Sequence, residues 1–310
     1  MIYTITFNPS LDLNMTVNGF ELSHTNRAGS EEMLLGGKGL NVSTVLKNFG
    51  VDNTAIYYVA GFTGDEIERR VLTSGIKSQC IKLDEGTSRI NVKIKNINGT
   101  EINGIGPDIP KTKVDELMDK IKSLQDGDIL VLAGSIPSSM PSTIYSDILE
   151  AVSDRNIKVI VDATGDLLVN TLKYNPFLVK PNNHELGEIF GVKLETREEV
   201  IPYAIKLKEM GAMNVIISMA AEGAVLVSND NKVYECEAPD GKVVNAVGAG
   251  DSMVAGFVAG CIDGNGILLD SIDYDYAFKL GLSAGSASAF SSDLATKEEI
   301  IKLYKKTYEK

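Results

Sequence analysis

Long apolar runs, clustered cysteines and paired histidines are all missing from this 310-residue sequence. No apolar stretch reaches the roughly 20 residues that a membrane-spanning helix needs. The first apolar run, Ile2–Phe7, is too short for a signal sequence and has no basic stretch before it. The three cysteines lie far apart without a C-x-x-C spacing, and His24 and His184 have no metal-ligand spacing. We therefore expect a cytoplasmic protein with reduced thiols and no membrane partner.

Basic residues are in the minority. The chain has 30 lysines and arginines against 42 aspartates and glutamates, a formal net charge of −12. Nucleic acids attract basic surfaces, so this balance argues against a nucleic-acid partner. An anionic ligand would have to be bound locally, by a few cations and backbone N–H groups.

Two nucleotide-binding signatures are also absent. The chain contains neither the P-loop pattern G-x-x-x-x-G-K-[ST] nor the dinucleotide pattern G-x-G-x-x-G. The second absence argues against an NAD-dependent oxidoreductase. Residues 281–285 match the G-x-S-x-G pattern of hydrolases, but they lie inside a helix-like segment and do not follow a strand. We therefore do not interpret them as a nucleophile elbow.

What the sequence does contain is an alternation of short apolar runs and segments with helical periodicity. The runs are Ile2–Phe7, Ile129–Ala133, Val159–Asp162, Phe177–Lys180, Val215–Met219 and Ala224–Ser228. The helix-like segments are Asn41–Phe49, Glu66–Leu72, Lys113–Leu124, Thr143–Val152, Glu198–Met210, Met253–Cys261, Tyr276–Ala289 and Lys297–Lys310. This order predicts an α/β fold with a mostly parallel sheet flanked by helices, in a single domain over residues 1–310. Ligands of such sheets bind at the carboxyl ends of the strands.

Two segments, residues 12–35 and 87–105, interrupt the alternation. Arg27–Leu35, Arg89–Ile97 and Thr100–Ile105 each alternate polar and apolar residues, and Asn98-Gly99 between the last two runs is a strong hairpin signal. We expect the two segments to leave the main sheet and to pair as a small antiparallel sheet, a lid over one end of it.

The loop Asn245–Ser252 precedes an apolar helix. Its small residues Gly248, Ala249 and Gly250 would let backbone N–H groups converge on an anion at the positive end of the helix dipole. Asp251 follows directly, where a carboxylate could act as base for a hydroxyl that attacks a phosphoryl group. A glycine-rich helix start with Asp251 as a charge cap is the alternative that this loop alone leaves open.

A second glycine-rich loop, Leu35–Asn41, also opens a helix. Gly36 and Gly37 would allow a ligand to approach closely, Lys38 offers a cation, and Asn41 projects from the first helical turn. Taken alone, this loop is equally compatible with a tight strand-to-helix turn.

The two loops together, about 210 residues apart in this order, resemble the two signature motifs of the ribokinase-like (phosphofructokinase-B) carbohydrate kinase family. Further matches are Asn8–Asp12, Gly134–Pro137, Lys180–Glu185 and Ser218–Gly223. The resemblance covers essentially the whole chain. It implies a ribokinase-like three-layer fold with a β-sheet lid, ATP as phosphoryl donor and Mg²⁺ as cofactor.

Within the family, the sequence is similar to bacterial 1-phosphofructokinases. The stretches that carry this similarity are residues 1–12, 26–27, 89–93, 245–256 and 284–291. The similarity implies phosphorylation of a phosphorylated ketohexose, namely fructose 1-phosphate to fructose 1,6-bisphosphate. A tagatose-6-phosphate kinase is the alternative within the family, and a catalytically silent sugar-phosphate sensor is the alternative from another class.

The resemblance also implies roles at the sugar end of the site. Asp12 would accept hydrogen bonds from sugar hydroxyls, with a turn-stabilising role as its alternative. The phosphate that the sugar already carries would bind to basic residues, since arginine pairs with two phosphate oxygens and lysine acts as a point charge. The implied substrate-binding residues are Asp12, Arg27, Gly37, Lys38, Asn41, Arg89, Ser135 and Asp251.

At the reaction centre and the nucleotide end, the resemblance implies Asp251 as general base, with Gly248, Ala249 and Gly250 as the anion hole. Asn182 and Glu185 would hold Mg²⁺, which prefers oxygen ligands, although a helix cap explains the same pair locally. The nucleotide would contact Lys180, Asn182, Ser218, Gly223 and Gly250. The nucleotide loop reads Ser218-Met219-Ala220 where the family usually has Ser-Leu-Gly, an exchange that the backbone tolerates where φ is negative.

The lid also suggests an oligomeric state. If one face of a thin sheet covers the sugar, apolar residues such as Met33, Leu35, Val92 and Ile94 are left without a core. The family resemblance implies dimers formed through the lids. We therefore expect a homodimer in which these residues are buried against a second subunit.

Overall fold

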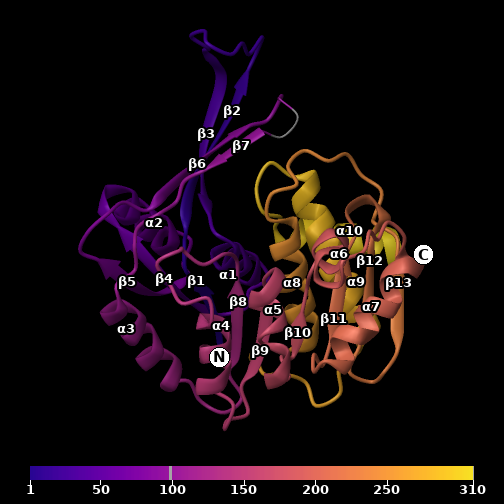
Figure 1. Ribbon diagram of the computed structural model, residues 1–310. Coiled ribbons are helices and arrows are strands. Elements are labelled where there is room, and N and C mark those ends of the chain that lie inside the picture. Colours follow the sequence, from indigo (N-terminus) through magenta and orange to yellow (C-terminus); the bar gives the residue numbers. More distant parts are fainter. Residues whose placement is uncertain (98–99, 310) are drawn as a thin grey trace.

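A nine-stranded sheet forms the centre of the computed structural model, which describes residues 1–97 and 100–309 (Figure 1). The strand order is β13-β12-β11-β10-β9-β8-β1-β4-β5, and every pair is parallel except β11–β12 and β12–β13. The strands are β1 (Ile2–Thr6), β4 (Asn53–Ala60), β5 (Lys77–Leu83), β8 (Ile129–Ala133), β9 (Lys158–Asp162), β10 (Leu178–Val179), β11 (Val215–Ser218), β12 (Ala224–Val227) and β13 (Val233–Cys236). The predicted mostly parallel sheet is confirmed.

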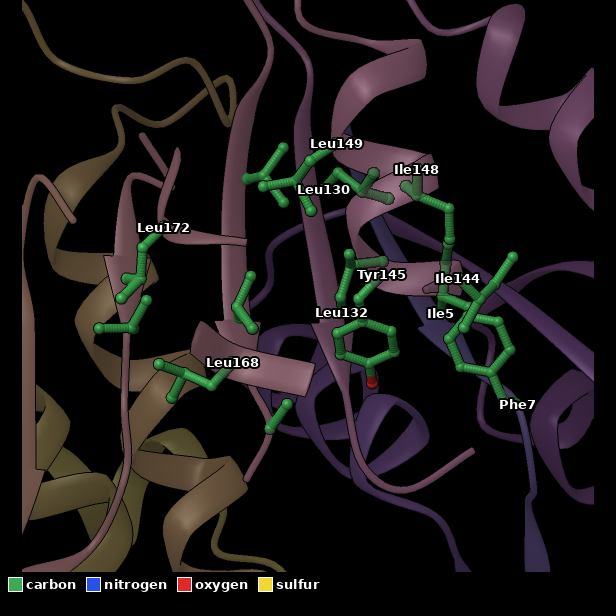
Figure 2. Close-up of a cluster of buried hydrophobic side chains, with 14 of the residues drawn as sticks. Ile5, Phe7, Leu130, Leu132, Ile144, Tyr145, Ile148, Leu149, Leu168 and Leu172 are labelled. Carbon is green, nitrogen blue, oxygen red and sulfur yellow. The ribbon is translucent and has the colours of Figure 1, made fainter. Parts of the chain in front are cut away.

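Helices cover both faces of this sheet. On one face lie α3 (Lys111–Lys122), α4 (Ile144–Ala151), α5 (Gly165–Val169), α6 (Asn183–Phe190) and α7 (Arg197–Glu209), with the 3₁₀ helix η1 (Leu172–Tyr174). Figure 2 shows part of this core, in which the rings of Phe7 and Tyr145 lie 5.5 Å apart beside Leu132. The other face is covered by α1 (Lys38–Asn48), α8 (Ala249–Cys261), α9 (Tyr274–Phe290) and α10 (Lys297–Tyr308). A smaller cluster joins α2 (Gly61–Thr73) to β4, and the 3₁₀ helix η2 (Ala220–Glu222) follows β11. Among the described residues, no helix has both the length and the apolar character needed to cross a membrane.

Helices α8 and α9 pack against each other through glycine and alanine. A Cβ on Gly256 would lie 2.7 Å from the Ala284 Cβ, and one on Gly281 would lie 2.9 Å from the Met253 carbonyl oxygen. Real side chains do not approach this closely, so the two helix backbones meet at a distance that only glycine permits. The G-x-S-x-G match at residues 281–285 is therefore explained by helix packing inside α9.

The second sheet rises from the main body as a separate arm (Figure 1). Its strands are β3 (Ala28–Gly36), β2 (Ser10–Val17), β6 (Arg89–Ile94) and β7 (Thr100–Asn103), in the order β3-β2-β6-β7. The β2–β6 pair is parallel, so the expectation of a purely antiparallel sheet was wrong. A parallel pair needs a long crossover, which β3, α1, β4, α2 and β5 supply. The hairpin turn predicted at Asn98-Gly99 lies outside the described residues.

The register gives this lid sheet two different faces. Asp12 lies opposite Asn91, and Lys93 lies opposite Glu101, so one face is polar. The other face carries alternate apolar residues: Leu11, Leu13, Met15, Met33, Leu35, Ile90, Val92, Ile94 and Ile102. This is the period-two alternation expected of strands with different environments on their two sides.

The prediction that Met33, Leu35, Val92 and Ile94 lack a core was wrong for most of them. Ile94 is buried, and Met33 and Leu35 pack against the cluster of α2 and β4, because the base of the lid lies on these elements. Val92 is partly buried. The large apolar side chains that are exposed around the lid are Phe20, Leu22, Ile90, Ile102 and Ile105.

Candidate active site

A cavity of about 1050 Å³ lies where the carboxyl ends of the central strands meet the polar face of the lid sheet. Below the lid, its lining comes from the loops after β1, β8, β9, β10, β11 and β13, from the first turns of α1 and α8, and from the second half of α9. These predicted site residues line it: Asp12, Gly37, Lys38, Asn41, Arg89, Ser135, Lys180, Asn182, Glu185, Ser218, Gly223, Gly248, Ala249, Gly250 and Asp251. Residues far apart in the sequence are therefore brought together at the edge of the sheet where the parallel topology predicts a ligand.

Arg27 is the predicted site residue that the cavity does not include. It is exposed and lies in the loop between β2 and β3, next to the pair Val17–Ala28 at the far end of the lid. The base of the lid, where Ser10 pairs with Gly36, is the end that meets the cavity. Within one chain, Arg27 is thus separated from the site by the length of two strands.

Asp251 lies in the first turn of α8 and is buried. The residue before this helix, Gly248, has φ of +77°, a left-handed conformation that favours glycine, and a Cβ there would lie 2.6 Å from Leu294 Cδ2. Asn41 Nδ2 donates a hydrogen bond of 2.7 Å to Asp251 Oδ2. The two glycine-rich loops that the sequence singles out therefore meet at this hydrogen bond.

The environment of Asp251 suits proton abstraction. Burial and the neighbouring Asp162 carboxylate raise the pKa of Asp251 to about 6, against the opposing effects of Lys38, the Asn41 hydrogen bond and Lys180. A carboxylate with this pKa is mostly ionised at neutral pH and is a stronger base than an exposed aspartate.

Asp162, the last residue of β9, was not among the predicted site residues. Its side chain is almost fully buried, and its Oδ1 lies 3.3 Å from Lys38 Nζ and 3.5 Å from Lys180 Nζ. Its Oδ2 is buried without a hydrogen-bond partner among the described residues. The available signal was its place at the carboxyl end of a predicted parallel strand.

Asp12 lies on the polar face of the lid and is held by several neighbours. Ser10 Oγ and Asn91 Nδ2 donate to its Oδ1 at 2.6 and 2.9 Å, and Lys93 Nζ lies 2.7 Å from its Oδ2. Arg89 is half-buried beside this group, and its Nε donates to the Asn8 carbonyl oxygen at 3.0 Å. Burial lowers the pKa of Arg89, while Asp12 opposes the shift.

Lys93 and Asn91 also line the cavity but were not predicted as site residues. The signal that could have found them is the alternation of β6. Arg89, Asn91 and Lys93 are two apart in sequence, so they share one face of the strand.

At the opposite end of the cavity, α6 begins with a capping box. Asn182 Oδ1 accepts from the Glu185 backbone N–H, and Glu185 Oε2 accepts from the Asn182 backbone N–H, both at 2.8 Å. The second oxygen of Glu185 makes no hydrogen bond to the residues the structure describes. Nowhere in residues 1–97 and 100–309 do three or more acidic, histidine or cysteine side chains form a group that could enclose a metal ion. The oxygen donors present fit Mg²⁺ that takes its remaining ligands from nucleotide phosphates and water.

Ala220 follows β11 in the nucleotide loop and has φ of +48°. Alanine therefore stands in place of the family's glycine at a left-handed position, contrary to the expectation of a negative φ. The side chain strains the backbone there. The strained residue lines the cavity next to Ala221.

Comparison with known proteins agrees with this geometry. Residues 6–300 match the pfkB family of carbohydrate kinases. The 1-phosphofructokinase of Bacillus subtilis (strain 168) is 44% identical over 303 residues, which cover 98% of this chain and 97% of that protein. The D-tagatose-1-phosphate kinase of Bacillus licheniformis is 34% identical over 95% of this chain and 94% of its own. A crystal structure of Escherichia coli phosphofructokinase-2 in complex with substrates and products has a TM-score of 0.88, with 25% identity over 98% of both chains. A match that covers nearly the whole chain, together with a buried carboxylate behind a glycine turn, shows that the chain belongs to the pfkB family of carbohydrate kinases.

Proposed function

We propose that the protein transfers the γ-phosphoryl group of ATP to fructose 1-phosphate and forms fructose 1,6-bisphosphate. The observation that carries this proposal is the position of Asp251, buried after a glycine turn in a cavity whose other end is lined by Asp12 and Arg89. The identity of 44% to a protein named 1-phosphofructokinase supports the choice of sugar. Both substrates are cytoplasmic metabolites, so we place the activity in the cytoplasm.

In this proposal Asp251 is the general base. The oxygen of the sugar C6 hydroxyl attacks the γ-phosphorus, its proton passes to the Asp251 carboxylate, and the bond from the γ-phosphorus to the bridging oxygen of ADP breaks. The backbone N–H groups of Gly248 and Gly250, at the positive end of α8, would stabilise the negative charge on the transferred oxygens. The Ala249 N–H, which donates to the Ala246 carbonyl oxygen at 3.3 Å, would join them by exchanging that bond. Gly248 permits the turn that aims them.

The sugar would bind between the lid and α1. Asp12, whose carboxylate is fixed by Asn91 and Lys93, would accept hydrogen bonds from the sugar hydroxyls. Arg89 donates its Nε to a backbone carbonyl, which leaves its two terminal amino groups for two oxygens of the sugar phosphate. Lys38, whose ammonium group lies 3.3 Å from Asp162 Oδ1, would add positive charge nearer to Asp251, and these local cations would let an acidic chain bind anions.

The nucleotide would lie at the other end of the cavity. Ser218 and Gly223 would contact it, and Lys180 would neutralise part of its phosphate charge. Mg²⁺ bound with ATP would be held by Glu185 and Asn182, directly or through water. Bound there, the ion would offset the charge of the β- and γ-phosphates.

A coupled assay of ADP release tests the proposal. Fructose 1-phosphate, tagatose 1-phosphate and tagatose 6-phosphate are supplied at equal concentration with MgATP, and we expect the highest kcat/KM with fructose 1-phosphate. A higher value with either tagatose phosphate would assign the protein to that substrate; a 34% identical relative is named D-tagatose-1-phosphate kinase. Binding of the sugar phosphate without ADP release would instead indicate a sensor.

We also propose that two copies of the chain pair through their lids. Residues 1–310 would form one kinase domain per subunit, with 12–35 and 87–105 as its lid. The apolar face of the lid sheet carries Ile90 and Ile102, which are exposed in the single chain, and Ile105 is exposed close by. Apolar side chains gathered on one side of a thin sheet favour burial against a partner.

A further inference from the structure

A buried charge cluster connects the two ends of the cavity. Lys38 belongs to the first turn of α1, which continues from the lid strand β3, whereas Lys180 follows β10 and precedes α6. Their ammonium groups approach the same oxygen of Asp162, at 3.3 and 3.5 Å. The sugar side and the nucleotide side of the cavity are thus joined through one carboxylate.

The geometry requires that this carboxylate be charged. Lys180 and Asp162 are both almost fully buried, and two ammonium groups this close to one oxygen would repel each other without a negative charge between them. Burial by itself would raise the pKa of Asp162, but Lys180 and Lys38 together hold it below its ordinary value. Asp162 in turn is the main reason that the pKa of Lys38 rises to about 12.

The cluster also lies against the proposed reaction centre. A Cβ on Gly250 would lie 3.2 Å from Lys180 Nζ, so this ammonium group is next to the first turn of α8. Asp251 lies in the same turn. Asp162 and Asp251 line the same cavity, and the second oxygen of Asp162 has no hydrogen-bond partner among the described residues.

We propose that Asp162 is a positioning residue for phosphoryl transfer, which holds the Lys38 and Lys180 ammonium groups on the two sides of the reacting phosphoryl group and sets the charge that Asp251 faces. This inference rests on the proposed function, because it takes Asp251 as the base. Asp162 need not touch either substrate; it acts through the two lysines and through its field on Asp251.

The proposal makes a signed prediction for the pH dependence. The groups that face Asp251 are Asp162 from β9, Lys38 and the Asn41 amide from α1, and Lys180 from the loop after β10. Asp162→Asn removes a negative neighbour, so the pKa of the base falls and the acid limb of the kcat/KM profile moves to lower pH. Lys38→Gln removes a positive neighbour and should move the same limb to higher pH.

The experiment measures kcat, both KM values and the pH profile of kcat/KM for fructose 1-phosphate with the full-length protein. For Asp162→Asn we expect kcat to fall about 10- to 100-fold, as for a displaced reacting group, with smaller changes in both KM values. Asp128→Asn is the matched control. Asp128 is also a buried carboxylate bonded to an ammonium group, the N-terminus at 2.9 Å, but it lies before β8 at the opposite end of the strands. This variant should leave the acid limb unmoved.

A wild-type kcat and pH profile in Asp162→Asn would overturn the proposal, as would shifts of the same sign in Asp162→Asn and Lys38→Gln. If Asp162→Asn does not fold, the Lys38→Gln profile still decides, since an unmoved or lowered acid limb contradicts the cluster. Failure of the proposed function is separable. Activity retained in Asp251→Asn would show that Asp251 is not the base. A loss of kcat in Asp162→Asn would still show that the reaction depends on the positions of the two lysines.

Discussion

At the scale of single residues, Asp251 differs from Asp12 and Asp162 in that no ammonium group of the described residues lies in direct contact with its carboxylate. Asp12 and Asp162 lie next to lysine ammonium groups, whereas Asp251 accepts from the neutral amide of Asn41. An ammonium group in direct contact would stabilise the ionised form and weaken the base. A neutral donor orients the carboxylate with a smaller loss of basicity.

We therefore expect Asp251→Asn to lower kcat about 10²- to 10⁴-fold, the usual contribution of a positioned acid–base group, with little change in the affinity for either substrate. Steady-state kinetics and a binding titration with the sugar phosphate measure the two effects. Asp52→Asn, at an exposed ion pair far from the cavity, is the control. A variant with near-wild-type kcat would remove Asp251 from the mechanism.

Arg89 should act on the sugar and not on the nucleotide. Arg89→Ala is expected to raise KM for the sugar phosphate about 10- to 100-fold, the loss of a hydrogen bond to a charged group, while KM for ATP stays nearly constant. Arg155→Ala is a matched control, since Arg155 is also partly buried and donates to backbone carbonyls, but it lies outside the cavity. An equal rise in both KM values would contradict this division of roles.

Ala220 gives a prediction about stability. Its left-handed φ of +48° is one that glycine adopts without strain, so Ala220→Gly should raise the free energy of unfolding by about 0.5–1 kcal/mol. Ala221→Gly is the control, because the neighbouring residue is not among those with positive φ. There the added backbone freedom should lower stability by about as much. Denaturant unfolding of the two variants compares the signs, and a loss of stability in both would refute the strain.

At the scale of elements, the accuracy of sequence-based prediction followed the clarity of the local pattern. The run Ile129–Ala133 coincides with β8, and Glu198–Met210 differs from α7 by one residue at each end. The strands β4 and β5 were missed. β4 begins with the polar pair Asn53-Thr54 although all eight of its positions are buried, and β5 has a polar first half. The parallel β2–β6 pair could not be predicted either, because the antiparallel hairpin is the default for neighbouring short strands.

The same contrast holds within the site. Residues in glycine-rich loops or helix starts, such as Gly37, Asn41 and Asp251, were predicted because the loop itself has a chemical purpose. Asp162 and Lys93 lie on strands, where the sequence pattern predicts a sheet but no chemical role. Their partners come from distant parts of the chain. A sequence shows such an ion pair only after the fold has placed both members.

The lid is the element from which we expect movement. Its polar face lines the cavity, and closing over the sugar would keep water from the phosphoryl group. Hydrogen exchange in Arg89–Ile97 should slow on addition of the sugar phosphate. Exchange in α7, on the opposite face of the sheet from α8, should not change. Unchanged exchange in the lid would exclude closure.

At the scale of the whole molecule, the position of Arg27 can report assembly. In one chain this residue is remote from the cavity, so an effect of Arg27→Ala on KM for the sugar phosphate requires a second copy that supplies it. We expect a homodimer by light scattering at working concentration, and a rise in this KM in Arg27→Ala. Lys95, an exposed lid residue outside the cavity, gives the control variant Lys95→Ala. A fully active monomer would exclude the dimer.

The glycine contacts between α8 and α9 have a consequence for how the protein can evolve. A methyl group at position 256, 260, 281 or 285 would meet atoms of the other helix at 2.9 Å or less, so these positions admit hardly any substitution although they form no part of the chemistry. Selection should therefore preserve them about as strictly as Asp251. Among related sequences, most invariant positions in these two helices would then be explained by the close approach of the two backbones. Only the few positions that face the cavity would be invariant because of the reaction.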